Sequence, residues 1–455
     1  MRNVLTRDRL LAGMLFMFAL AIYANALTFD FLSSWDDNFY LLENDLIPHL
    51  SWPNLKETFT NFFVGNYAPV HIISYMVEYA FWGFAPSGYH AANLVLHGGN
   101  GVLAYFLFRR LRLPPGAALV AAVLFLCHPV QVESVAWISE SKNLLALGFL
   151  LVAFHGYCAY RDAPSRRWRW YAVALAAALL ALLCKSIAVI FPAVLVLYDL
   201  CFPRRGEPRR GIAVADKLPF VLAAAVVVVM TLVGQSEQAG GGRRDFPGGS
   251  PLSTLYTMLP VLGSYLRDCL VPGDLLPYYL VKIRTHVDGT VIAMVLVALG
   301  LILFGWFLWR RNRHAFFYYA FFFLALLPVS QVVPLVTLKQ DRYLYVPLLG
   351  FAGLVAEGGN FLWQRFPRGR KVVAGTALLL ILAHSALTLK QVRIWRDDLT
   401  LWNHTVSVDP ENMMGWVLLA KLHTMRGDKP EALAALRTFT QLKLKYGPIR
   451  GYPSY

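Results

Sequence analysis

The chain has 455 residues, of which 57% are hydrophobic and only 15% are charged, and its mean hydropathy is +0.49. So few charged side chains cannot cover the surface of a water-soluble protein of this length. The composition therefore excludes a soluble enzyme and predicts a polytopic membrane protein.

Eleven apolar runs are candidates for membrane-spanning helices, which need roughly 17–25 residues. Three arginines precede the first run, but no small-residue cleavage site follows it, so we expect an uncleaved anchor. Segment 170–200 would be about 46 Å long as one helix, so we expect two short arms that meet at Lys185. The eleven runs cover residues 10–28, 87–108, 116–136, 143–160, 170–184, 187–200, 213–234, 289–309, 315–336, 343–363 and 372–389.

The basic residues predict the orientation of these helices, because short cytoplasmic loops of membrane proteins are rich in Lys and Arg. Alternate connections hold 22 of the 42 Lys and Arg residues, at residues 2–9, 109–112, 161–169, 204–217, 310–313 and 365–371. We therefore expect a cytoplasmic N-terminus, an external C-terminus and long external loops at residues 29–86 and 235–288. The formal net charge of +15 then reflects topology and contact with anionic lipid, so nucleic acid is not an expected partner.

The second external loop contains the glycine-rich residues 240–249, which we expect to form a flexible lid. Residues 252–270 are apolar enough for a further span. A span there would move the arginines at 310–313 to the outside. We therefore expect a helix that lies on the outer face or re-enters from it.

Charged residues return beyond residue 390, and the pattern there predicts amphipathic helices. Trp416, Gly427 and Ala432 fall at characteristic positions of a tetratricopeptide repeat, a unit of about 34 residues. We expect Asp428 to be the N-cap of its second helix. The chain is thus divided into a membrane domain at residues 1–390 and an external helical segment at residues 391–455, which should pack on the external loops.

Two adjacent aspartates, Asp36 and Asp37, follow the first span. Aromatic neighbours such as Trp35 and Tyr40 should place them at the level of the lipid headgroups. Adjacent carboxylates tend to raise the pKa of one of the pair, which suits a general base. The alternative interpretation is a helix cap or a solvated pair in a loop.

Three basic residues, Lys185, Lys339 and Arg342, lie on the predicted outer side, against the charge rule. The alternative interpretation is that each side chain extends along its helix and places its charge in the membrane–water interface. A lipid phosphate at the outer surface would compensate all three charges. We expect Lys185 and Arg342 to converge on one phosphate position that faces Asp36.

Other polar residues lie where a membrane helix does not need them. His90 belongs to a stripe with Asn93 and His97, which indicates either interhelical hydrogen bonds or a cavity wall. We interpret five residues as cavity-lining or acceptor-binding, namely His128, Glu133, Tyr67, His90 and Tyr343. The spacing of His and Glu matches no known metal motif and the five cysteines show no regular spacing, so we expect no metal site and no disulfide framework.

The order of the motifs resembles that of the transmembrane-and-tetratricopeptide protein O-mannosyltransferases, which are GT-C glycosyltransferases. The resemblance implies an all-α GT-C fold and an inverting transfer of a sugar from a polyprenyl-phosphate donor, with Asp36 as the base and Asp37 orienting the acceptor. Ala68 departs from the arginine that relatives often have, and the repeat array is cut to about one unit. The motifs are Asp36-Asp37, Tyr67-Ala68-Pro69, residues 88–94, residues 128–133 with 143–145, Cys184-Lys185 with residues 197–199, Leu327-Pro328 with residues 342–344, and the terminal repeat unit.

We thus expect a glycosyltransferase that acts on a protein or glycan hydroxyl at the outer face of the membrane. Its partners would be membrane lipid, the lipid-linked donor and the acceptor, and it would require no cofactor, although an acidic pair does not exclude a divalent metal. The expected location is the bacterial inner membrane with a periplasmic active site, or the endoplasmic reticulum membrane in a eukaryote. The alternatives are transfer to lipid A, another glycolipid or a polymer, a transporter or flippase of lipid-linked sugars, and a non-catalytic assembly scaffold.

Overall fold

The computed structural model describes residues 2–163, 167–203, 214–234 and 245–447. These residues form helices and connecting loops, and a bridge between Phe63 and Asn66 is the one β pairing among them. The predicted all-α class is therefore confirmed. Helices are the expected solution, because a helix satisfies every backbone hydrogen bond within its own segment when lipid surrounds it.

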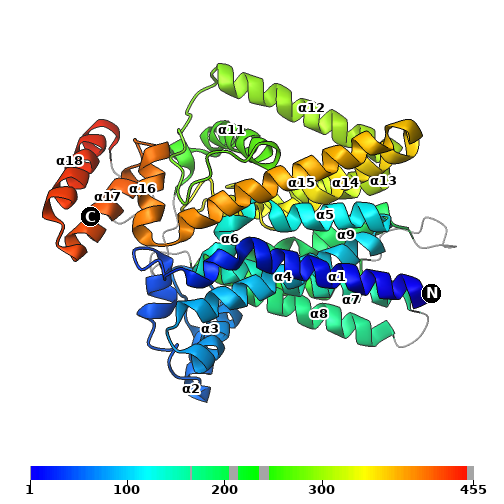
Figure 1. The fold of residues 1–455 in the computed structure, drawn as a ribbon, viewed down its shortest axis with the longest axis horizontal. Helices are drawn as coiled ribbons and strands as arrows, with labels where there is room; N and C mark the ends of the chain where they lie inside the picture. The colour runs from blue at the N-terminus through cyan, green and yellow to red at the C-terminus, as the bar shows by residue number, and fades with distance from the viewer. Residues whose placement is uncertain (1, 164–166, 204–213, 235–244, 448–455) are drawn as a thin grey trace.

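Eleven helices coincide with the eleven apolar runs and lie mostly along the long axis of the molecule (Figure 1). By length and composition, six described helices are able to cross a membrane, and a bent pair would add a seventh. The number of eleven spans therefore stays a prediction. The helices are α1 (Arg2–Tyr23), α4 (Pro86–Arg110), α5 (Pro115–Cys127), α7 (Ser141–Asp162), α8 (Arg167–Cys184), α9 (Phe191–Cys201), α10 (Leu218–Gly234), α12 (Gly289–Arg311), α13 (Arg313–Leu326), α14 (Pro347–Arg365) and α15 (Arg370–Val392).

The third predicted run, residues 116–136, is broken, so its interpretation as one continuous span was wrong. Helix α5 ends at Cys127, His128 is extended, and the chain continues at an angle of 52° through the short helices η3 (Pro129–Gln131) and α6 (Val132–Ala136). Pro129 explains the break, because proline lacks a backbone N–H and keeps the preceding residue out of the helical region. The bend carries Glu133 into the site described below.

The second break was predicted and is present. Helix α8 ends at Cys184, Lys185 is extended, and the chain resumes in η5 (Ser186–Ile190) and α9. Two later runs are shorter than predicted, because α13 ends before Pro328 and α14 begins only at Pro347, after η9 (Asp341–Leu344). Loops with polar side chains therefore lie at the ends of these helices.

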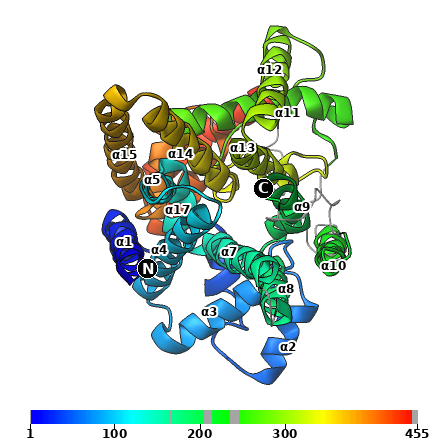
Figure 2. The ribbon, with the colours of Figure 1, turned by 90° about the vertical axis from the view of Figure 1, so that its right-hand side faces the viewer.

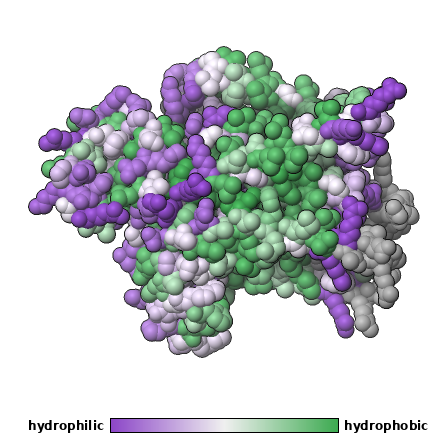
Figure 3. Space-filling view, in the orientation of Figure 1, coloured by the Kyte–Doolittle hydropathy of each residue, from purple (hydrophilic) through white to green (hydrophobic). Residues whose placement is uncertain are grey.

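The two ends of the bundle carry different parts of the chain. The N-terminus and the α14–α15 connection lie at one end, whereas α2 (Trp52–Thr60), α3 (Pro69–Trp82) and the C-terminal helices lie at the other (Figure 1). Hydrophobic residues gather over the middle, and hydrophilic residues gather towards both ends (Figure 3). This agrees with the loop parity that the basic residues predicted, although Arg166, Arg204, Arg205, Arg209 and Arg210 lie outside the described residues.

Helix α11 (Pro251–Leu270) crosses the direction of the bundle. Figure 2 views most bundle helices nearly end-on and shows α11 from the side. It is not among the helices whose length and composition suit a span. This agrees with the predicted surface or re-entrant helix, while residues 240–244 of the predicted lid lie outside the described residues.

The C-terminal helices α16 (Asp398–Val408), α17 (Met413–Arg426) and α18 (Lys429–Tyr446) pack on the external loops, as predicted. The Asn412 side chain donates to the Tyr278 carbonyl at 3.0 Å, and the Asp30 N–H donates to the Arg396 carbonyl at 3.1 Å. Asp428 is the N-cap residue of α18, as predicted, although its carboxylate makes no cap hydrogen bond and instead lies 3.4 Å from His423. The division at residue 390 stays a prediction, and residues 448–455 lie outside the described part.

The topology is tested by cysteine labelling of intact cells with a membrane-impermeant reagent. We expect cysteines at the exposed positions Lys56 and Arg437 to be labelled from outside, and a cysteine at the exposed Arg368, at the opposite end, to be labelled only after lysis. All five native cysteines are buried and give a low background. Labelling of Arg368→Cys in intact cells would reverse the orientation.

Candidate functional site

The loop after α1 gives the two adjacent aspartates different surroundings. Asp37 is buried, and its carboxylate accepts hydrogen bonds from the backbone N–H groups of Leu32 and Ser139, each at 2.9 Å, and from the Ser139 hydroxyl. Burial raises the pKa of Asp37 to about 7, against the lowering effect of these bonds. Both carboxylate oxygens are thus engaged within the protein, and the expected contact of Asp37 with an acceptor stays a prediction.

Asp36 has a carboxyl group that makes no hydrogen bond or ion pair with the described residues, and it is only partly buried. Burial raises the pKa of Asp36, and the charges of Lys142 and Arg342 lower it in part. A carboxyl group without an internal partner, close to cations, is available to take a proton from a bound molecule. Of the two aspartates, Asp36 therefore has the geometry of a base.

Glu140 is the centre of a buried ion cluster whose charges act on the Asp36 carboxyl group. Its Oε2 atom accepts from Lys185 Nζ at 2.8 Å and from Asn143 Nδ2 at 2.7 Å. Its Oε1 atom lies 3.3 Å from Lys142 Nζ and 3.4 Å from Arg342 Nε. Three cations from three separate segments thus converge on one carboxylate.

Arg342 is fixed by a second carboxylate. Glu133 accepts from the backbone N–H of Arg342 at 2.6 Å and also pairs with its guanidinium group. The guanidinium group lies 5.3 Å from the ring centre of Trp137 and 5.6 Å from that of Tyr343. The break at Pro129 makes this pairing possible, because it places Glu133 on a short helix that faces the Arg342 loop.

The predicted convergence of Lys185 and Arg342 is therefore present in space, at Glu140. The assumption behind it was wrong, because Glu140 and Glu133 supply counter-charges that we had assigned to a lipid phosphate alone. Asp36 adds a third carboxyl group, which balances the three cations when it is ionised. The binding of a phosphate by Lys185 and Arg342 stays a prediction.

Lys339 does not join this cluster. Its Nζ atom lies 2.7 Å from Asp268 of α11 and 4.0 Å from the ring centre of Tyr279. Tyr279 in turn donates to Asp341 at 2.7 Å. These contacts attach α11 and the second external loop to the segment that carries Arg342, so the geometry gives Lys339 an anchoring position.

The five residues predicted to line a cavity or bind an acceptor are separated by the structure. Glu133 and Tyr343 contact Arg342. His128 bonds to the Cys269 carbonyl at 3.0 Å, Tyr67 donates to the Phe59 carbonyl at 3.1 Å, and the buried His90 packs 6.1 Å from the ring of Phe29. These last three residues make no described contact with the cluster, and their predicted roles are not supported by its geometry.

Glu140 and Lys142 lie between two of the predicted spans, and the sequence does not indicate their central position in the cluster. It gave no signal for His71, a single histidine in an apolar helix. Its buried ring lies 5.4 Å from that of Tyr40 and 4.4 Å from that of Tyr75, and neither ring nitrogen has a hydrogen-bond partner among the described residues. Over the described residues, no three His, Cys, Asp or Glu side chains form a group suited to a metal ion.

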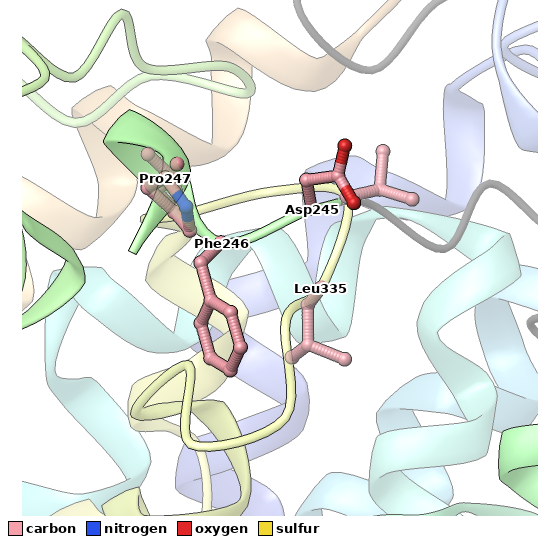
Figure 4. Close-up of a pocket in the computed structure, with 7 residues that line it drawn as sticks. Asp245, Phe246, Pro247 and Leu335 are labelled. Atoms are coloured by element: carbon pink, nitrogen blue, oxygen red, sulfur yellow. The ribbon is translucent and has the colours of Figure 1, made fainter. Parts of the chain in front are cut away.

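A hollow of about 340 Å³ lies between the second external loop and the segment that leads to Lys339. In Figure 4 the side chains of Phe246 and Leu335 extend in the same direction, and the carboxylate of Asp245 points the other way. The hollow is mostly apolar, and it lies close in sequence to the Arg342 segment. Its lining residues are Asp245, Phe246, Pro247, Gly249, Leu335, Val336 and Leu338.

Comparison with curated proteins identifies relatives of one kind, although no family model matches the chain. The human protein O-mannosyl-transferase TMTC4 is 25% identical over 438 residues, which cover 82% of this chain and 57% of the relative. The mouse protein O-mannosyl-transferase TMTC3 is 26% identical over 445 residues, which cover 87% and 47%. The chain spans about half the length of these relatives. The resemblance drawn from the order of the motifs is thereby confirmed.

Solved structures also match this chain, at TM-scores below 0.5. The apo oligosaccharyltransferase from Archaeoglobus fulgidus matches with a TM-score of 0.46 and 13% identity, over 98% of this chain and 61% of that one. ArnT from Cupriavidus metallidurans, bound to undecaprenyl phosphate, matches with a TM-score of 0.45 and 17% identity, over 94% and 76%. TM-scores this low give no support for a shared fold, so the fold is defined by the helices of this chain alone.

Arg342→Ala should destabilise the protein strongly, because it leaves Glu133 and Glu140 buried with fewer cations. Removing one partner of a buried ion pair costs about 3–5 kcal/mol. Thermal unfolding in detergent measures the effect, and Arg368→Ala at an exposed position is the matched control. Equal melting temperatures for the two variants would mean that the cluster does not hold the fold together.

Proposed function

We propose that this chain is an inverting glycosyltransferase of the GT-C type. It would move a sugar from a polyprenyl-phosphate donor to an acceptor hydroxyl at the outer face of the membrane. The observation that carries the proposal is the carboxyl group of Asp36, which has no hydrogen-bond or ion-pair partner among the described residues and is influenced by the charges of the cluster around Glu140. The group lies at the end of a membrane bundle where the positive-inside rule predicts the outside. The named activity of the relatives in human and mouse supports it.

The reaction needs a base and a group that stabilises the departing phosphate. The acceptor oxygen attacks the anomeric carbon on the face opposite the phosphate and transfers its proton to Asp36. The bond between that carbon and the phosphate oxygen breaks, and its electron pair stays on the phosphate. One displacement of this kind inverts the configuration at the anomeric carbon.

The cation cluster suits the leaving phosphate. As Asp36 takes up a proton, its negative charge disappears while a new negative charge develops on the phosphate. Lys185 and Arg342 then stabilise the charge on the phosphate in place of the charge on Asp36. Glu133 and Glu140 hold both cations in fixed orientations, so little reorganisation is needed when the charge moves. The proposal assigns the base and the stabilisation of the phosphate to these side chains and invokes no resident cofactor.

The donor and acceptor follow from the surroundings and from the relatives. A cationic site at the end of a membrane bundle favours a lipid-linked phosphate donor, which reaches it from the bilayer. The relatives are named protein O-mannosyl-transferases, so we take mannose as the sugar and a protein hydroxyl as the acceptor. Membrane lipid, the donor lipid and the acceptor are then the partners, and the membrane is the bacterial inner membrane or, in a eukaryote, the endoplasmic reticulum membrane.

Asp36→Asn should lower turnover by roughly 10²–10⁴-fold, which is the usual contribution of a general base. Binding of polyprenyl phosphate should be unchanged, because the cations remain. The assay is transfer of labelled mannose from polyprenyl-phosphate mannose to a peptide by purified protein in lipid discs. Asp30→Asn, an exposed aspartate in the same loop, is the matched control. Turnover of Asp36→Asn within threefold of the wild type would remove Asp36 as the base, whereas a wild type that transfers no sugar would favour a transporter or a scaffold over a transferase.

The turnover number should fall as the pH is lowered through the pKa of Asp36, because the base must be deprotonated. Burial raises this pKa in the folded protein, so the acidic limb of the pH profile should lie above the ordinary aspartate value of about 3.9. A pH series of kcat for the wild type measures it. A profile without an acidic limb down to that ordinary value would argue against Asp36 as the base.

Lys185→Ala should weaken the binding of polyprenyl phosphate at least tenfold. The exposed fraction of the Lys185 side chain is 20%, against 8% for Lys142 and 12% for Arg342, so Lys185 is the most accessible cation of the cluster. Titration with polyprenyl phosphate in detergent measures the affinity, and Lys56→Ala at an exposed position controls for net charge. Equal affinities of the two variants would remove Lys185 from the donor site.

A further inference from the structure

Asp398, in the first turn of α16, bonds to the loop that carries Asp36. Its carboxylate accepts from the Ser33 hydroxyl at 3.1 Å, from the Ser34 N–H at 3.2 Å and from the Ser34 hydroxyl. The indole N–H of Trp402, one turn further along α16, donates to the same Ser34 hydroxyl at 3.0 Å. Two residues of the C-terminal segment thus hold a dipeptide that lies more than 360 positions earlier in the chain.

Asp398 is not needed to cap its own helix. Asp397 is the N-cap of α16, and its carboxylate accepts from the Thr400 N–H at 2.8 Å. Asp398 is buried, and its side-chain hydrogen bonds go to the serine pair. The second of these two adjacent acids is therefore directed at the loop after α1.

The loop is held from both sides. On one side Asp398 holds Ser33 and Ser34, and on the other Asp37 is tied to the Ser139 N–H of η4 (Ile138–Glu140). Asp36 lies between these attachments, two residues after Ser34 and one before Asp37. Since each residue has only two soft backbone torsions, fixing both sides leaves the Asp36 backbone little freedom.

Aromatic contacts continue from α16 to the cation cluster. The ring centre of Trp402 lies 5.1 Å from that of Trp35, and Trp35 lies 6.1 Å from Trp137. Trp137 lies under the guanidinium group of Arg342 and stacks at 5.9 Å on Trp395, just before α16. The same segment therefore supports both the base loop and one of the cations.

We propose that α16 belongs to the catalytic centre and that Asp398 is a positioning residue, which sets the place of the Asp36 carboxyl group relative to Lys185 and Arg342. The proposal rests on the proposed function for its effect on transfer, and on the described contacts for its effect on the loop. A displacement of about 1 Å at a reacting group can cost about 10²-fold in rate. We therefore expect a loss of about 10–100-fold in kcat when the carboxylate is removed, with little change in the KM for the donor.

The experiment compares Asp398→Ala with Asp397→Asn, which keeps the helix cap while removing the same charge. For each purified variant, kcat and the donor KM are measured in lipid discs with polyprenyl-phosphate mannose and peptide. Hydrogen exchange of the peptide that covers residues 29–42 is followed in parallel. Asp398→Ala should lose kcat at constant KM and exchange faster at Ser34, and Asp397→Asn should resemble the wild type.

A double variant separates positioning from general loosening. Asp398→Ala removes every hydrogen bond of the carboxylate to the serine pair, and Ser34→Ala removes one of the same bonds together with the acceptor of Trp402, so the combined loss in kcat should be smaller than the product of the single losses. Multiplied losses would overturn the proposal. If Asp398→Ala does not fold, the variant with both Ser33→Ala and Ser34→Ala carries the test, because it removes both hydroxyl donors to Asp398, and a kcat within twofold of the wild type would overturn the proposal.

The outcomes for the two proposals are distinguishable. If the wild type transfers sugar, Asp36→Asn does not, and Asp398→Ala keeps its kcat, the positioning role fails and the proposed function stands. If the wild type transfers no sugar, the proposed function fails. In that case unchanged exchange of residues 29–42 in Asp398→Ala also overturns the attachment of the loop, and faster exchange supports it.

Discussion

The buried carboxylate of Glu140 is the interaction on which the candidate site depends. Its cationic partners come from the start of α7, the break between α8 and α9, and the loop before α14. An apolar helix face offers no counter-charge, and the protein supplies one in Glu140. An ion cluster of this kind gives little net stability after desolvation. Its effect is to fix three segments, distant in sequence, at one point.

The helices were largely predictable because the bilayer imposes simple rules on their length and charge. The interruption at Lys185 was recognised because a single helix over residues 170–200 would be too long. The interruption at Pro129 was missed, since the apolar run continues through it and prolines are tolerated within membrane helices. An apolar pattern records which residues avoid water, but not where the axis of a helix changes direction.

The site was predictable only in part, and the reason is chemical. Cations on the outer side are costly, so Lys185 and Arg342 stood out as single residues. The roles of Asp36 and Asp37 cannot be separated by sequence, because their side chains are identical and the folded loop decides which one meets Ser139. Asp397 and Asp398 present the same ambiguity. His71 gave no signal, because its position depends on the packing of Tyr40 and Tyr75.

Helix α7 begins at Ser141, directly after Glu140, so the N-terminal end of a 22-residue helix lies at the ion cluster. The aligned peptide dipoles of such a helix are equivalent to roughly half a positive charge at this end. Unlike a lysine, this charge neither titrates nor turns away. Part of the positive potential at the cluster is thus built into the backbone, where no side-chain substitution removes it.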